Sequence, residues 1–290
     1  MRASIRLTRW IVSVGAILWT ASGVAQPQGR PGAPSVAGGA FILADVVKRL
    51  KSGDDAQVKD ALDEVRTAGR GGAAAVPVIV DLLRAGTSPA LSKAALETLG
   101  DTEDGDASEV LAWYARHRNV DLRRAAVAAL ARTRGPVAVR ALRSALSDSD
   151  STVRGISATA LGEMKVHEAI AELFAALERG VVEAAASIGE LCSGPECEQL
   201  VAKLGALPFD VVTSGLDQVL LRPPAEIDDA MKLGIVGRIR ELGTAEANHF
   251  LKGVQAKWPP KGSRHVKQAI DQAVLATAGS PGADGSERAP

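Results

Sequence analysis

Apolar and polar positions alternate at helical spacing through the central part of the chain, and the whole pattern recurs every 31 residues. The period is clearest in two sets of apolar residues, namely Val80, Leu111, Leu142 and Leu173, and Leu99, Leu130 and Leu161. Neighbouring positions repeat at the same spacing, as Arg123 and Arg154 show. One helix pair cannot bury its apolar side until another pair covers it, so this period predicts stacked helical hairpins.

Each unit divides into two helices joined by a short polar turn. In the clearest unit, residues 137–146 carry apolar side chains on one side of a helix, and residues 152–163 form a second such helix with Ile156 expected in the core. The turn at 147–151 reads Ser-Asp-Ser-Asp-Ser. Its side chains are suited to cap the N-terminus of the second helix and to complement its dipole.

By extension, the pattern predicts seven helix pairs and a last single helix. They are expected at about 42–68, 73–100, 107–133, 136–163, 167–192, 196–221, 226–256 and 263–278. The final three pairs lose the 31-residue period, and Pro223-Pro224 and Pro259-Pro260 interrupt the chain between helices. Terminal repeats are expected to be irregular because they must end the stack with a polar surface.

Several stretches resemble HEAT repeats. Residues 76–83 (VPVIVDLL) are similar to the first helix of such a repeat, whereas 148–162 (DSDSTVRGISATALG) and 122–130 (LRRAAVAAL) resemble its turn and second helix. The short period is similar to that of the bacterial HEAT-like repeats of phycobilisome lyases. The resemblance implies an all-α fold, a right-handed α-solenoid of about seven helical-hairpin repeats over residues 41–278. It also implies protein binding along a curved surface lined by the second helices, although a few members of the family are enzymes.

Composition agrees with an all-helical chain. Hydrophobic residues make up 46% of the 290 residues but aromatic residues only 3%, which argues against sandwiches and barrels because their strands favour aromatic side chains. The 34 basic and 34 acidic side chains cancel. This balance excludes a globally basic nucleic-acid binder and leaves room only for a local basic patch.

The first 25 residues have the three parts of a Sec-type signal peptide. Arg2, Arg6 and Arg9 form a positive region, residues 10–19 an uncharged apolar core, and Gly23-Val24-Ala25 a small-residue cleavage motif. The uncharged stretch is shorter than the roughly 20 residues that a membrane-spanning helix needs. We therefore expect cleavage after Ala25, with retention as an anchor as the alternative, and a periplasmic or secreted protein without stable membrane insertion.

Segments rich in Pro and Gly flank the predicted solenoid. Residues 26–40 (QPQGRPGAPSVAGGA) are expected to form a flexible linker, and residues 279–290 a disordered tail.

The strongest local charge feature is an arginine-rich stretch. Residues 113–143 contain Asp121 as their one acid, beside Trp113, Tyr114 and eight arginines. We expect a partner-binding face made of Trp113, Tyr114, Arg116, Arg118, Arg123, Arg124 and Arg154, because Trp, Tyr and Arg are frequent in interface hot spots. Two alternatives stay open: arginines that are solvated or paired with aspartates, and a nucleic-acid groove like that of HEAT-like DNA glycosylases, which the expected export disfavours.

The two cysteines, Cys192 and Cys197, lie between the end of one second helix and the start of the next first helix. In an exported chain this spacing predicts a disulfide that pins one corner between repeats, with two reduced thiols as the alternative. Their four intervening residues do not match a redox Cys-x-x-Cys motif.

No catalytic motif stands out along the chain. Members that resemble deoxyhypusine hydroxylase hold two irons with several His-Glu pairs, whereas this chain has the single pair His167-Glu168. The acidic loop 101–106 does not match EF-hand spacing. The sequence therefore predicts no metal, no cofactor and no enzyme activity. It predicts an exported scaffold that binds a protein partner, and the arginines favour an acidic partner. The alternative is an enzyme or a nucleic-acid binder.

Overall fold

The computed structural model describes residues 41–278. The predicted signal peptide at 1–25, the linker at 26–40 and the tail at 279–290 lie outside the described residues.

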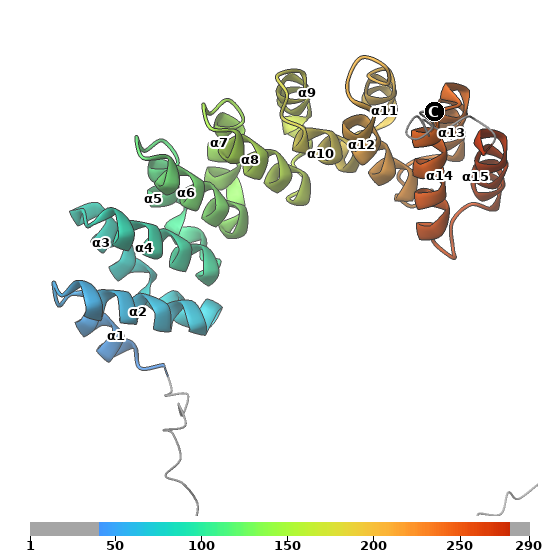
Figure 1. Cartoon of the computed structure of the whole chain (residues 1–290). Helices are drawn as coiled ribbons and strands as arrows, with labels where there is room; N and C mark the ends of the chain where they lie inside the picture. The colour runs from blue at the N-terminus through green and yellow to red at the C-terminus, as the bar shows by residue number, and fades with distance from the viewer. Residues whose placement is uncertain (1–40, 279–290) are drawn as a thin grey trace, which may run out of the picture. The chain divides into compact units, whose positions relative to one another are not determined.

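The described residues form fifteen α-helices and three short 3-10 helices, and no β-strand (Figure 1). The helices are α1 (Leu43–Leu50), α2 (Asp55–Ala68), η1 (Gly69–Ala75), α3 (Val76–Ala85), α4 (Pro89–Thr102), η2 (Gly105–Ala107), α5 (Ser108–Tyr114), α6 (Val120–Thr133), α7 (Gly135–Ala145), α8 (Ser151–Glu163), η3 (His167–Ala169), α9 (Ile170–Glu178), α10 (Glu183–Leu191), α11 (Gly194–Val201), α12 (Phe209–Leu221), α13 (Asp229–Leu242), α14 (Ala245–Lys257) and α15 (Arg264–Thr277). Each predicted pair is present and α15 follows as the last helix, so the prediction of an all-α solenoid is confirmed.

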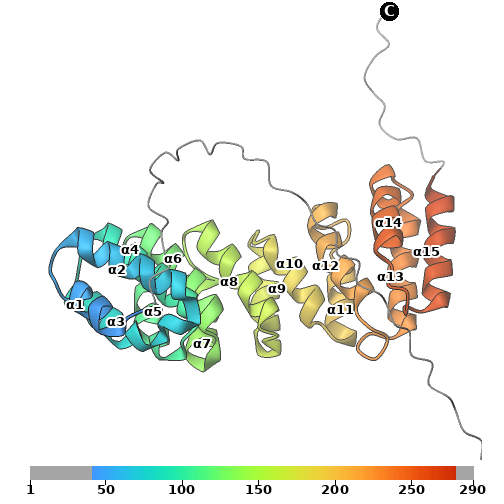
Figure 2. The same cartoon turned by 90° about the horizontal axis from the view of Figure 1, so that it is seen from below.

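The even-numbered helices stack directly on one another from α2 to α12, while the odd-numbered helices flank this stack (Figures 1 and 2). Fully buried leucines such as Leu99, Leu130 and Leu161 fill the interior at the 31-residue period. Burial of these side chains accounts for the periodic apolar pattern, because each junction between repeats needs the same core residue.

Small residues set the close approach of the stacked helices. A Cβ atom added at Gly100 of α4 would lie 2.9 Å from the Cα atom of Ala129 in α6, and one added at Gly162 of α8 would lie 2.7 Å from the hydroxyl oxygen of Ser187 in α10. Contacts this short are below those of real side chains. These positions therefore need glycine for packing rather than for an unusual backbone conformation.

Polar side chains begin most of the stacked helices. In the turn between α7 and α8, a carboxylate oxygen of Asp150 accepts a hydrogen bond from the backbone N–H of Val153 at 3.0 Å, as the Ser-Asp-Ser-Asp-Ser pattern predicts. Asp54, Asn119 and Asp228 cap their helices in the same way. Such caps satisfy N–H groups that a helix leaves unpaired in its first turn.

The stack changes character near its C-terminal end. Helices α13, α14 and α15 pack mutually, and α14 contacts α12 much less extensively than α12 contacts α10. This change coincides with the loss of the 31-residue period after the Pro223-Pro224 break. Within residues 41–278, every helix is too short or too polar to cross a membrane.

Candidate functional site

Arg123 of α6 lies at the junction between two helix pairs and is fully engaged there. Its Nε and Nη2 atoms donate to the two carboxylate oxygens of Asp148, each at 2.9 Å, and its Nη1 atom donates to the carbonyl of His117 at 3.0 Å. Only 13% of each paired side chain is exposed. A bidentate pair of this kind is among the stronger hydrogen-bonded ion pairs in proteins and leaves little donor capacity for a partner.

Arg124 makes the neighbouring pair. Its Nε and Nη2 atoms donate to the carboxylate of Asp150 at 3.0 and 2.6 Å. The hydrogen bond from Arg124, together with that from the N–H of Val153, lowers the pKa of Asp150 to about 2. The alternative of arginines paired with aspartates therefore holds for Arg123 and Arg124, and their role in binding a partner stays a prediction.

Arg154 of α8 is the counterpart of Arg123 one repeat later. Its Nη1 atom donates to the carbonyls of Asp148 and Ser149 at 2.9 and 3.0 Å, just as Arg123 donates to the turn before its own helix. One period of 31 residues after Asp148, however, the chain has Arg179 in place of an aspartate. No acidic side chain within residues 41–278 forms an ion pair with Arg154, which leaves part of its guanidinium available.

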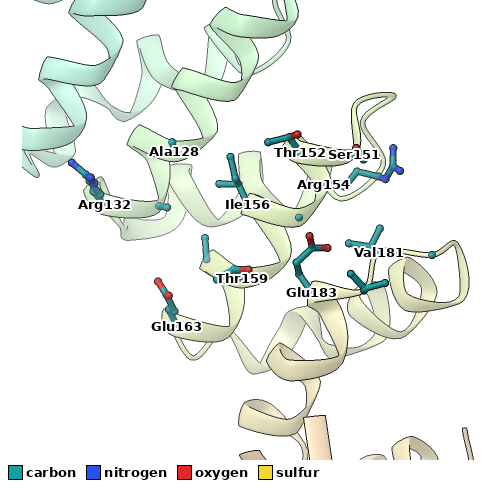
Figure 3. A pocket seen from close by; sticks show the side chains of 15 residues that line it. Ala128, Arg132, Ser151, Thr152, Arg154, Ile156, Thr159, Glu163, Val181 and Glu183 are labelled. Atoms are coloured by element: carbon teal, nitrogen blue, oxygen red, sulfur yellow. The ribbon is translucent and has the colours of Figure 1, made fainter. Parts of the chain in front are cut away.

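A groove of about 630 Å³ opens beside Arg154, between α6, α8 and the start of α10 (Figure 3). Gly155 and Val181 occupy the positions that Arg124 and Asp150 occupy one repeat earlier. The groove exists because the Arg124–Asp150 ion pair therefore has no counterpart in this repeat. The carboxylate of Glu183 lies against Gly155, where a Cβ atom would be 2.7 Å from it. Ile156, expected in the core, is half-buried and lines this groove.

Tyr114 is buried, with 4% of its surface exposed, and its hydroxyl donates to the carbonyl of Leu83 at 3.1 Å. Its predicted role as a surface anchor is therefore wrong. A signal in the sequence could have shown this, because Tyr114 lies three residues after Leu111 and so on the same buried side of the helix. Trp113 lies two residues after Leu111, and 65% of its surface is exposed.

Trp113, Arg116 and Arg118 meet in one groove of about 840 Å³ between α5 and α7. From here on we call it the Trp113 groove. Arg140 of α7 completes it, and a smaller hollow of about 370 Å³ continues it past Arg118 toward Ser147. Among the described residues, Arg116, Arg118 and Arg140 have no carboxylate within ion-pair distance.

The Trp113 groove contains residues that the sequence-based prediction did not include, namely Glu109, Ala112, His117, Val137, Arg140 and Ala141. Arg140 belongs to the arginine-rich stretch, but only the packing of α5 against α7 shows that it joins Arg116 and Arg118. The groove is formed by first helices, so it does not lie on the second-helix surface where HEAT-like repeats were expected to bind.

The structure joins Cys192 and Cys197 in a disulfide at the corner between α10 and α11. Both cysteines are fully buried, and Arg222 donates through its Nη1 atom to the carbonyl of Cys192 at 2.6 Å. The side chain of Glu196 accepts from the backbone N–H of Ser193 at 3.2 Å and thereby begins α11. These contacts give the corner a structural role.

His167 belongs to a structural contact rather than to an assembled metal site. Its Nδ1 atom lies 3.1 Å from the carbonyl oxygen of Leu191. In the part of the chain that the structure describes, no group of three or more His, Cys, Asp or Glu side chains is arranged to hold a metal ion.

Solved structures with similar architecture include repeat proteins of several kinds. The complex of CpcE and CpcF of phycocyanin lyase from Nostoc sp. PCC7120 is 18% identical, with a TM-score of 0.45, and the match covers 86% of this chain and 100% of that one. A designed armadillo repeat protein is 17% identical (TM-score 0.41; 81% and 100% covered). Human deoxyhypusine hydroxylase is 16% identical (TM-score 0.29; 81% and 84% covered).

The comparison with curated proteins gives no match. The family model of HEAT repeats matches residues 107–190, which span helices α5 to α10 and the Trp113 groove. The helix pairs seen in this segment are those that such repeats require. Residues 107–190 of this all-α solenoid are therefore similar to HEAT repeats.

Proposed function

We propose that this protein is an exported, non-catalytic scaffold that binds an acidic protein partner through the Trp113 groove. HEAT repeats commonly mediate protein binding, and the observation that carries the finer proposal is the exposed Trp113 beside three arginines that form no ion pair among residues 41–278. Trp and Arg contribute strongly to protein interfaces because they combine large contact area with charge.

The charges in the groove favour an acidic partner. Arg116, Arg118 and Arg140 outnumber the single acid Glu109. Complementary charge raises the rate of association and suppresses wrong partners more than it raises affinity. The apolar area of Trp113 would then supply most of the binding energy, with the arginines fixing the orientation of the partner.

The proposal is tested by cross-linking and capture with the tagged protein in the envelope of its host. The variant Arg116→Glu/Arg118→Glu/Arg140→Glu should lose a partner that the unchanged protein retains. The control Lys48→Glu/Lys51→Glu/Arg264→Glu changes the net charge equally at exposed sites outside the groove and should retain it. Equal capture by both variants, or binding of duplex DNA in place of protein, would contradict the proposal.

Export is proposed from the N-terminal sequence and has its own test. Fractionation of the host should place the protein in the periplasm or the medium, and N-terminal sequencing should begin at Gln26. A cytoplasmic protein that begins at Met1 would contradict export without bearing on the Trp113 groove.

A further inference from the structure

An apolar groove of about 710 Å³ lies between the N-terminal ends of α12 and α14. We call it the Phe209 groove. Phe209 of α12 and Phe250 of α14 form its aromatic part, with their ring centroids 6.2 Å apart and their planes nearly perpendicular. Pro208 and Ala245 add further apolar surface. Ligand-binding hollows of this volume and character accept aromatic or aliphatic groups.

The groove arises where the close packing of the stack ends. Gly100, Gly162 and Gly189 each lie against the next stacked helix, so close that an added Cβ atom has no room. Between α12 and α14, two phenylalanines take the place of small residues and the helices touch far less. Large side chains hold these helix ends apart and remain half-buried at the surface.

The rim of the Phe209 groove is acidic. Asp210 and Glu246 lie in the first turns of α12 and α14, both are exposed, and neither forms an ion pair with any described lysine or arginine. His249 is the one basic group in the lining and is exposed as well. The groove therefore suits an apolar side chain that is flanked by positive charge.

The same chain presents such a group. Trp113 is 65% exposed and has Arg116 and Arg140 beside it in the Trp113 groove. Helix α5 packs against α3, α6 and α7, several repeats along the stack from α12 and α14 (Figure 1). Trp113 is therefore far from the Phe209 groove of its own chain, and contact between the two requires two molecules.

We propose that the Phe209 groove is a docking site for Trp113 of a second copy of this chain, with Arg116 and Arg140 of one copy facing Asp210 and Glu246 of the other. The inference rests on the proposed function because it assigns a partner to the same Trp113 face. Two different surfaces meet in this contact, so a pair joined by it still has one free Trp113 face and one free Phe209 groove. Contacts of this type build chains or rings rather than closed two-fold dimers.

Sedimentation velocity of the purified protein over a range of concentrations tests the docking. The average mass should rise with concentration, and the rise should weaken at high salt because exposed charges are screened. Trp113→Ser and Phe250→Ser should each weaken self-association by about tenfold or more, as expected for a central aromatic anchor. Ile42→Ser, which removes another exposed apolar side chain, should leave it unchanged.

Mixing the two defective variants gives the decisive result. Trp113→Ser keeps an intact Phe209 groove and Phe250→Ser keeps an intact Trp113, so the mixture should form a one-to-one dimer and nothing larger. A monomer at all concentrations up to about 1 mM, self-association that survives Trp113→Ser, or a mixture without dimer would overturn the inference. Circular dichroism of each variant excludes unfolding as the cause.

The proposed function can survive the failure of this inference. If the protein stays monomeric but still captures an acidic partner that the Arg116→Glu/Arg118→Glu/Arg140→Glu variant loses, then the Trp113 groove binds another protein and the Phe209 groove has no part in it. If self-association is confirmed and no other partner is found, the second copy is the partner.

Discussion

Single residues at the helix junctions decide how closely the repeats pack. Gly162 touches Ser187, and Arg124 holds Asp150 across the same kind of junction one repeat earlier. The Gly162–Ser187 contact depends on the absence of a side chain, so an added methyl group should disrupt it. The Arg124–Asp150 contact depends on opposite charge, so it should respond to pH.

Gly162→Ala should lower the free energy of unfolding by about 1–3 kcal/mol, because its methyl group would overlap Ser187 and force α8 and α10 apart. Gly234→Ala in α13 is the matched control, since nothing lies within 4 Å of the added atom. There the better helix propensity of alanine should stabilise the protein by about 0.5–1 kcal/mol. Urea unfolding of both variants measures the difference, and equal effects would show that the junction is not tight.

Asp150→Asn should make stability less sensitive to acid. A carboxyl with a pKa of about 2 in the folded chain and about 3.8 in the unfolded chain stabilises the fold above pH 4, and this contribution is lost as the pH falls toward 2. Asparagine retains a cap for the N–H of Val153 but not the charge that pairs with Arg124. The variant should therefore be less stable at pH 7 and approach the unchanged protein near pH 2; a difference that is constant with pH would contradict this.

For single residues, the sequence predicts which side chains are buried better than it predicts which side chains form ion pairs. The 31-residue period places Leu99, Leu130 and Leu161 in the core, as the structure confirms, and the spacing from Leu111 would have separated buried Tyr114 from exposed Trp113. The partner of Arg123, by contrast, lies 25 residues along the chain in the turn of the next repeat. Such a contact depends on how one repeat is rotated on another, which no local pattern contains.

The predicted helix pairs agree with the observed ones even where the period is lost, because each pair keeps its own apolar side and its own turn residues. The differences are at the ends of helices and at the grooves. A groove forms where neighbouring pairs fail to fill the space between them, as at Gly155 and Val181 or at Phe209 and Phe250. The sequence shows these residues but not the space that they leave.

Leu130→Ala should lower the free energy of unfolding by about 2–5 kcal/mol, because Leu130 is completely buried in the core of the stack and its loss leaves a cavity. Leu275→Ala removes the same atoms from a side chain that is 77% exposed and should change stability by less than about 0.5 kcal/mol. Thermal or denaturant unfolding compares them. A small effect at Leu130 would place it outside the core of the stack.

The corner between α10 and α11 carries its own prediction. Cys192→Ala/Cys197→Ala should lower the free energy of unfolding by roughly 2 kcal/mol, the loss of chain entropy expected for closing so short a loop. Reduction of the unchanged protein should have a similar effect. Alkylation of both thiols in the native protein without prior reduction would show that the disulfide does not form.

At the scale of the whole molecule, the stack is held by contacts between neighbours, so its stability depends on each junction in turn. From α2 to α12 the junctions are close and lined by small residues and buried leucines. The junction of α12 with α14 is looser and contains the Phe209 groove, while α13, α14 and α15 pack mainly on one another. This places the weakest link of the described chain between α12 and α14.

Native-state hydrogen exchange in low denaturant should therefore show α13 to α15 opening as one unit, with a lower free energy than helices α4 to α12. Leu130→Ala should lower protection in α4 to α8 while leaving that of α13 to α15 nearly unchanged, since no contact with the C-terminal helices is removed. The contrary result would be one opening free energy for all helices of residues 41–278, lowered equally everywhere by Leu130→Ala. It would show that the close packing of the central repeats extends through the Phe209 groove and that the solenoid is one cooperative unit.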